Sequence, residues 1–193
     1  MSTIWFTSDW HFNHQKDFIY QARGFTSPEE MNEIIIQKFN TWVRPNDDVY
    51  CLGDCMLGGS ERIEEGIDLI NRLNGNLHII RGNHDSNKRW EAYHQLYPKI
   101  VELETAMFWK FDKYNFYLSH FPSLTSNYDD DKPLKQKTIN LCGHTHTTDK
   151  FADIDKGLIY HCEVDAHDCF PVDIEEIIED IKSKCHNKLI NPI

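Results

Sequence analysis

Short apolar runs along the chain alternate with longer stretches in which apolar residues recur every three or four positions. The short runs are rich in β-branched and aromatic side chains, which is typical of buried strands. They predict strands at Ile4–Thr7, Val49–Leu52, Leu77–Ile80, Ala106–Phe111, Phe116–Leu118 and Ile139–Cys142. A polar turn separates the fourth run from the fifth, which favours antiparallel pairing of these two strands.

The periodic stretches predict three helices. The first begins after Ser27, because Pro28 suits the first turn and Glu30 completes a capping box with the serine. Its expected buried face consists of Met31, Ile34, Ile35, Phe39 and Trp42. The second helix is predicted from Ser60 to Leu73 and the third from about Ile174 to Ser183.

This alternation of strands and helices predicts the α/β class. We expect one domain over residues 1–193, with a loosely held tail at about 186–193. The expected architecture is a four-layer α-β-β-α sandwich with two mixed sheets.

Charge and composition narrow the range of partners. The chain has 20 Lys+Arg against 31 Asp+Glu and a formal net charge of −11, so a general affinity for nucleic acid is not expected. No apolar run is long enough to cross a bilayer, and nothing resembles a secretory signal. We therefore expect a cytoplasmic protein without a membrane partner, whose 6 cysteines are free thiols. The sequence leaves the oligomeric state open.

Aspartate, asparagine and histidine residues follow the predicted strands. In chain order they are Asp9 and His11, Asp54, Asn83 and His84, His120, and finally His144 and His146. Ligands of α/β sheets bind at the carboxyl ends of the strands, so we expect these side chains to converge there. Glycines beside several of them allow the backbone to turn sharply and to approach a small ligand.

The donor types indicate a metal site. Carboxylates, imidazoles and an amide, without thiolate, form a mixed nitrogen and oxygen site for divalent transition metals. Seven ligands exceed the needs of one tetrahedral ion and suit two ions that share a bridging carboxylate, for which Asp54 is the candidate. The expected cofactors are two divalent metal ions, Mn²⁺ first, with Fe, Ni, Zn or Mg as alternatives.

The same residues carry a family resemblance. In order, Asp9-x-His11, Gly53-Asp54, Gly82-Asn83-His84-Asp85, His120 and Gly143-His144-x-His146 resemble the motif set of the calcineurin-like metallophosphoesterases, especially compact bacterial and phage members. The resemblance spans residues 4 to 146. It implies one metal on Asp9, His11 and His146, a second on Asn83, His120 and His144, and Asp54 as the bridge.

The resemblance also implies an activity. It suggests hydrolysis of phosphodiesters, and also of phosphomonoesters, by metal-activated hydroxide, with His84 as the general acid and a small phosphoester such as a nucleotide as substrate. Cys55-Met56-Leu57 follows Asp54 in place of the arginine-bearing extension of protein serine/threonine phosphatases, which argues against protein dephosphorylation. Two alternatives remain: a non-catalytic scaffold with this fold, and a nuclease, for which only Lys132, Lys135 and Lys137 cluster.

Secondary candidates surround the motifs. His14, Arg23 and Arg81 are possible substrate contacts; the competing interpretations are a solvated loop histidine and surface arginines. Asp85 either orients His84 or caps the following helix. The loop at 121–138 is either a solvated turn or a substrate lid, in which Phe121 and Tyr128 stack on an aromatic ester. The sequence does not identify the natural substrate.

Overall fold

The computed structural model describes residues 2–123, 133–152 and 158–190. The helices are α1 (Asp17–Tyr20), α2 (Pro28–Trp42), α3 (Ile63–Asn71), α4 (Asn87–Tyr93) and α5 (Ile174–Ile190). The strands are β1 (Ile4–Thr7), β2 (Asp48–Cys51), β3 (Asn76–Ile80), β4 (Ile100–Glu104), β5 (Ala106–Phe111), β6 (Tyr114–Ser119), β7 (Thr138–Cys142), β8 (Leu158–His161) and β9 (Val172–Asp173). Short 3₁₀ helices are η1 (Ser60–Arg62), η2 (His94–Leu96), η3 (Leu134–Gln136) and η4 (Val164–His167).

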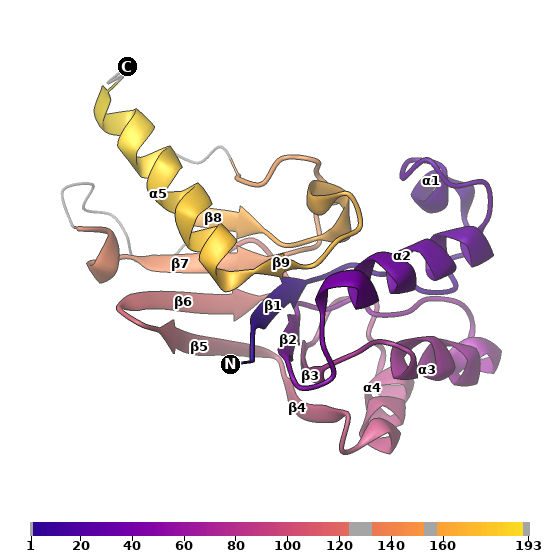
Figure 1. Ribbon diagram of the computed structural model, residues 1–193. Coiled ribbons are helices and arrows are strands. Elements are labelled where there is room, and N and C mark those ends of the chain that lie inside the picture. Colours follow the sequence, from indigo (N-terminus) through magenta and orange to yellow (C-terminus); the bar gives the residue numbers. More distant parts are fainter. Residues whose placement is uncertain (1, 124–132, 153–157, 191–193) are drawn as a thin grey trace.

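Two sheets form the framework (Figure 1). The first has the order β4-β3-β2-β1-β9, in which β1 to β4 are parallel and β9 is antiparallel to β1. The second has the order β5-β6-β7-β8, with an antiparallel hairpin followed by parallel pairs. The predicted α/β fold with two mixed sheets is therefore confirmed.

Helices α2, α3 and α4 cover one face of the first sheet. Met31, Ile35 and Phe39 of α2 are fully buried there against the strands. Ser27 caps α2 by accepting a hydrogen bond from the Glu30 amide, as the sequence predicts. Trp42 was expected on the buried face but is 56% exposed. The helix ends at Trp42, and the next residue, Val43, turns the chain and occupies the core instead.

The second core lies between the two sheets. Phe6 of β1 and Leu52, which directly follows β2, pack with inward-facing residues of the second sheet, such as Phe116. The apolar face of α5 joins this core through the isoleucines that the sequence predicts, namely Ile174, Ile177, Ile178 and Ile181. Figure 1 shows α5 beside β8 and β9.

Some boundaries differ from the predictions. Helix α5 continues to Ile190, past the predicted end at Ser183, and residues 191–193 of the expected tail lie outside the described residues. The stretch 124–132 of the expected lid, with Tyr128 and Lys132, also lies outside them. None of the described helices combines the length and the apolar composition that crossing a membrane requires. The six cysteines are free thiols, as expected.

Candidate metal centre

The motif residues lie immediately after the carboxyl ends of five strands, three in the first sheet and two in the second. Asp9 and His11 follow β1, Asp54 follows β2, Asn83 and His84 follow β3, His120 follows β6, and His144 and His146 follow β7. The backbone joins neighbouring loops, because the Asp9 amide donates to Gly53 O over 2.9 Å and the His11 amide to Asp54 O over 3.1 Å. The loops after β1 and β2 therefore run side by side.

The backbone at these donors adopts an uncommon conformation. Positive φ angles occur at Asp9 (57°), His11 (50°), Asp54 (55°), His144 (78°) and His146 (51°). A non-glycine residue in the left-handed region costs about 1–3 kcal/mol and persists only where the surroundings enforce it. Five of the seven candidate ligands are in this region, so the conformation that presents these five side chains is maintained at an energetic cost.

Two glycines allow the loops to approach one another. A Cβ at Gly82 would collide with the carboxylate and the amide nitrogen of Asp54. A Cβ at Gly143 would collide with the Ser8 hydroxyl and the Asp9 carboxylate. The glycines of the motifs thus leave room for the two carboxylates.

Asp9 lies at the centre of the first donor group. It is fully buried, and its Oδ2 accepts hydrogen bonds from the Ser8 hydroxyl and from the His144 amide (2.9 Å). Its Oδ1 has no hydrogen-bond partner and lies 3.5 Å from His11 Nε2 and 3.7 Å from His146 Nε2. A buried carboxylate oxygen without a donor is costly, and a cation shared with the two imidazoles would satisfy it. These residues therefore fit a divalent metal.

Asp54 and His120 form the second donor group. Asp54 Oδ2 lies 3.5 Å from His120 Nε2 and 3.7 Å from His11 Nε2, so it stands between the two groups. His120 Nδ1 is 2.8 Å from Leu52 O, which only accepts, so Nδ1 carries the proton. Nε2 lies 2.8 Å from Asn83 Oδ1, which also only accepts, so in the metal-free protein Nε2 carries a proton as well, and a metal ion would take the place of that proton. This arrangement suits Nε2 as a metal ligand.

The compact groups differ in two respects from the ligand sets that the resemblance implies. Ligand atoms of Asp9, His11 and His146 lie within 4.8 Å of one another, and so do those of Asp9, Asp54 and His120. Asp9 thus belongs to both groups. The His144 ring belongs to neither of them; its centroid lies 5.1 Å from that of His120 and 4.6 Å from that of Phe121.

The electrostatics favour ionised carboxylates. Burial raises the pKa of Asp9, but the nearby imidazoles, His11 first, outweigh it and hold that pKa well below its usual range. Burial opposes protonation of His120, yet the Asp54 hydrogen bond and the charges of Asp9 and Asp54 raise the pKa of His120 to about 9. Burial lowers the pKa of His11, which leaves its ring neutral and able to bind a metal.

His84 stands on the open side of these groups. Its side chain is 46% exposed, and its Nε2 lies 4.0 Å from Asp54 Oδ2. The His84 amide donates to Asp54 Oδ1 over 2.8 Å, and its carbonyl accepts a hydrogen bond from Arg89. The main chain is therefore held, while the imidazole faces both the carboxylates and solvent.

The interpretation of His14 as a solvated loop histidine is wrong, because its side chain is buried. Its Nδ1 accepts a hydrogen bond from the Lys16 amide over 3.1 Å, and its ring lies 5.6 Å from that of His11. Burial and the neighbouring imidazoles lower the pKa of His14 to about 4, so the ring is neutral at pH 7. A substrate contact by His14 remains a prediction.

The side chains of Arg81 and Arg23 both donate hydrogen bonds to other residues of the protein. Arg81 donates to Asp85 O over 2.9 Å and stacks on the Trp90 ring, so it supports the start of α4. The Arg23 side chain is 3% exposed, which contradicts the interpretation as a surface arginine. Its guanidinium forms an ion pair with Asp165 and donates hydrogen bonds to the Asp9 and Trp10 carbonyls. The nitrogen atoms that would bind a phosphate are therefore already hydrogen-bonded to the protein.

Two acidic residues have roles that the motifs do not reveal. Asp85 neither orients His84 nor caps α4, since Ser86 is the cap. Its buried carboxylate instead accepts hydrogen bonds from the Asp54 and Gly82 amides, both over 2.8 Å, and so ties two ligand loops together. Asp165 lies 3.0 Å from His146 Nδ1, and no pattern in its sequence neighbourhood marks it.

Comparisons with known proteins give a family match and several similar proteins. Residues 3–161 match the family model described as the calcineurin-like phosphoesterase superfamily domain. An uncharacterized protein of Methanocaldococcus jannaschii is 37% identical over 131 residues, which cover 67% of this chain and 65% of that protein. The alignment thus spans slightly less than two thirds of the relative.

Two further proteins are similar over most of their length. The Gene 66 protein of Mycobacterium phage D29 is 26% identical over 206 residues, covering 94% of this chain and 98% of that protein. The crystal structure of a protein of unknown function from Aquifex aeolicus has a TM-score of 0.70 at 20% identity, covering 93% of this chain and 99% of the other. At that identity the likeness shows the fold alone.

Proposed function

The chain belongs to the calcineurin-like phosphoesterase superfamily, and from this premise we propose that it is a dinuclear-metal phosphoesterase that prefers phosphodiesters to phosphomonoesters. One observation carries the proposal. Asp9 Oδ1 is buried without a hydrogen-bond donor and faces the imidazoles of His11 and His146. Such an oxygen is costly in a protein core and is stabilised by a bound cation.

We assign the ligands as the family resemblance implies. Asp9, His11 and His146 hold one ion, Asn83, His120 and His144 hold the other, and Asp54 is shared. When bound, two divalent ions, Mn²⁺ by our proposal, polarise a phosphoryl group and supply a nucleophilic water at neutral pH. The position of Asp54 Oδ2 between His11 and His120 supports its role as the bridge.

His84 supplies the proton in this proposal. Its imidazole is beside Asp54 and reaches solvent, so it can meet a substrate that enters the open side of the site. An imidazole can hold a proton near neutral pH and donate it to the oxygen of a departing alkoxide. A diester releases a poor alkoxide leaving group, which gains most from an acid, so His84 favours phosphodiester substrates.

Phe121 offers a surface for an apolar ester group. It is 48% exposed and contacts the rings of His144 and His120 edge to face, with centroids 4.6 Å and 5.1 Å away. A planar group stacked on this ring would lie directly beside the metal centre. We therefore expect aryl or nucleoside diesters to bind better than alkyl diesters. The free thiols favour a reducing compartment such as the cytoplasm.

An assay with bis-aryl and mono-aryl phosphates tests the proposal. We expect hydrolysis of the bis-aryl phosphate with Mn²⁺, loss of activity after chelation, and recovery when Mn²⁺ is restored. A panel of cyclic nucleotides, dinucleotides, nucleotide monoesters and lipid-type diesters then narrows the substrate class. Inactivity toward the whole panel by protein that has bound Mn²⁺ would support a non-catalytic scaffold instead. A steep salt dependence of oligonucleotide binding would favour a nuclease.

A further inference from the structure

An ion pair outside the family motifs lies against the proposed metal centre. Arg23 follows α1 and Asp165 lies in η4, far apart in the chain. Their side chains are 3% and 11% exposed. Arg23 Nε donates to Asp165 Oδ1 over 2.9 Å and Nη2 donates to Oδ2 over 2.8 Å. Such bidentate pairs are strong and fix both side chains in one orientation.

The pair contacts the first donor group from two sides. Arg23 donates to Asp9 O over 2.8 Å and to Trp10 O over 3.2 Å, which holds the left-handed turn at Asp9. Asp165 Oδ2 lies 3.0 Å from His146 Nδ1. The ion pair therefore connects the ligand loop after β1 to the ligand loop after β7.

The chemistry of the three groups determines where the His146 proton lies. Arg23 Nη2 is also 3.3 Å from His146 Nδ1, but a guanidinium only donates, whereas an ionised carboxylate only accepts. The contact with Asp165 is shorter, at 3.0 Å, and two hydrogen bonds from Arg23 hold the Asp165 side chain as a carboxylate. His146 Nδ1 is accordingly the donor, and the lone pair of the neutral ring is on Nε2.

From this geometry we propose that Asp165 is a positioning residue for His146, and that Arg23 holds Asp165 in place. The carboxylate fixes the ring so that Nε2 points at Asp9 Oδ1, 3.7 Å away, and at His11 Nε2, 3.1 Å away. The inference rests on the proposed metal centre, since it concerns how one of its ligands is oriented. Outer partners of this kind fix the tautomer of a ligating histidine and raise its basicity.

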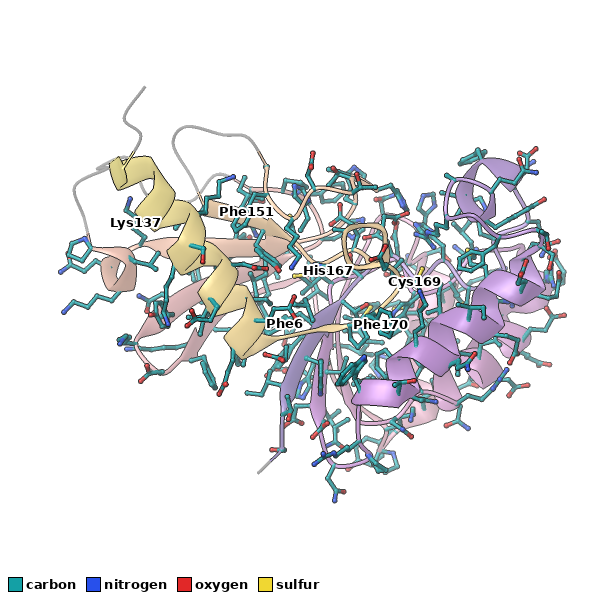
Figure 2. The ribbon with its side chains drawn as sticks, turned by 45° about the horizontal axis from the view of Figure 1, so that its top comes forward. Phe6, Lys137, Phe151, His167, Cys169 and Phe170 are labelled. Atoms are coloured by element: carbon teal, nitrogen blue, oxygen red, sulfur yellow. The ribbon has the colours of Figure 1, made fainter. Side chains whose placement is uncertain are left out.

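The place of η4 explains how the pair is supported. Figure 2 shows His167, from the same short helix, and Cys169 near the middle of the molecule, between the ribbons of α5 and α2. His167 Nε2 is 2.9 Å from His161 O, and Val164 is buried in the first core. The segment that carries Asp165 is thus fixed on both sides of it.

Mn²⁺ titration of variants tests the inference. Asp165→Ala is expected to weaken binding by about 10- to 100-fold, the usual effect of losing an outer partner of a ligating histidine. Asp165→Asn is expected to be intermediate, because its amide oxygen still accepts from Nδ1–H. Asp180→Asn is the matched control. Asp180, on α5, accepts hydrogen bonds from Lys150 (2.9 Å) and Tyr160 (2.8 Å), and the Mn²⁺ affinity of this variant should equal that of the wild type.

Thermal unfolding of the metal-free proteins separates positioning from general support. If the change in Mn²⁺ affinity is specific to the Asp165 variants while Asp180→Asn alters only the Tm, the inference stands. Wild-type Mn²⁺ affinity in folded Asp165→Asn and Asp165→Ala would overturn the inference and leave the proposed function intact. Absence of Mn²⁺ binding by the wild type would instead overturn the proposed function.

Discussion

Two buried aspartates at opposite ends of the first sheet show how differently the fold treats the same side chain. Asp47 precedes β2, and its carboxylate accepts from the Thr3 amide (2.9 Å), the Trp5 indole (3.1 Å) and the Arg44 amide (2.9 Å). Asp9 follows β1, has a φ of 57°, and leaves Oδ1 without any donor. Burial raises the pKa of both carboxyls, but hydrogen bonds to Asp47 and the imidazoles around Asp9 lower them below their usual values.

This difference in hydrogen bonding distinguishes the amino end of the sheet, which is structural, from the carboxyl end, which holds the candidate site. At the amino end, donors fixed by the backbone satisfy the buried charge, so the arrangement is stable without a ligand. At the carboxyl end, strained backbone and a spare acceptor oxygen remain, a combination that is unfavourable in the isolated protein and favourable once a cation is bound. Substitution of Asp9 should therefore weaken metal binding and spare stability, whereas substitution of Asp47 should lower stability and spare metal binding.

Asp9→Asn should give the largest functional effect. The amide removes the charge that both donor groups share, so Mn²⁺-dependent hydrolysis should fall by more than about 100-fold, beyond the effect of losing an outer partner alone. The metal-free variant should unfold at about the same temperature as the wild type, because the lost attraction between the carboxylate and the imidazoles offsets the removal of a buried, unsatisfied oxygen. Calorimetry of the metal-free protein measures the unfolding temperature, and an assay with a bis-aryl phosphate and Mn²⁺ measures the activity; full activity in this variant would refute the ligand assignment.

His84→Ala should give the next largest effect. Loss of a general acid typically lowers kcat by about 10²- to 10⁴-fold, while the metal content should stay at the wild-type level. Steady-state kinetics with a bis-aryl phosphate, together with metal analysis, check this prediction. An aryl ester with a more acidic leaving group is the control, because it should be impaired less. If the variant loses its metal ions, His84 has a ligand role instead.

Asp47→Asn should destabilise the fold and spare the site. At least one of its three donors loses its acceptor, which costs about 1–3 kcal/mol of unfolding free energy when the group is buried. The pKa of Asp47 is depressed, so its contribution is present above the ordinary value of 3.8 and is lost as the pH falls further. The difference from wild type, measured by denaturant unfolding, should shrink in acid. A large fall in Mn²⁺ affinity would contradict the separation of the two edges.

Phe121→Ala should have the smallest effect. Loss of one aromatic contact is worth about 0.5–1.5 kcal/mol, so KM for a bis-aryl phosphate should rise roughly 2- to 10-fold with kcat little changed. Phe108→Ala is the control, since Phe108 is 79% exposed and contacts Tyr117 of the second sheet. Equal changes in the two variants would remove Phe121 from the substrate site.

The sequence was most informative where local patterns decide the structure. Strand β5 and the start of α2 match their predicted boundaries, because apolar runs and a capping serine act locally. Strands β4, β8 and β9 were not predicted. Val101 of β4 is 45% exposed at a sheet edge, β9 has only two residues, and neither of these two strands carries a continuous apolar signal. The apolar run of β8 covers only residues 158–160.

The candidate site shows the same division. Motif residues could be located because each directly follows a strand, and parallel strands bring such positions to one edge. The roles of Arg23, Asp85 and Asp165 could not be predicted in the same way. Their partners lie on distant segments, so only the folded arrangement reveals that they hold the ligand loops.

Titration of the metal-free protein with Mn²⁺ tests the central claim most directly. The account predicts two ions bound per chain of wild-type protein, and a loss of tight binding in Asp9→Asn but not in Asp47→Asn. Binding of no ion by the folded wild type, or equal binding by both variants, would contradict it.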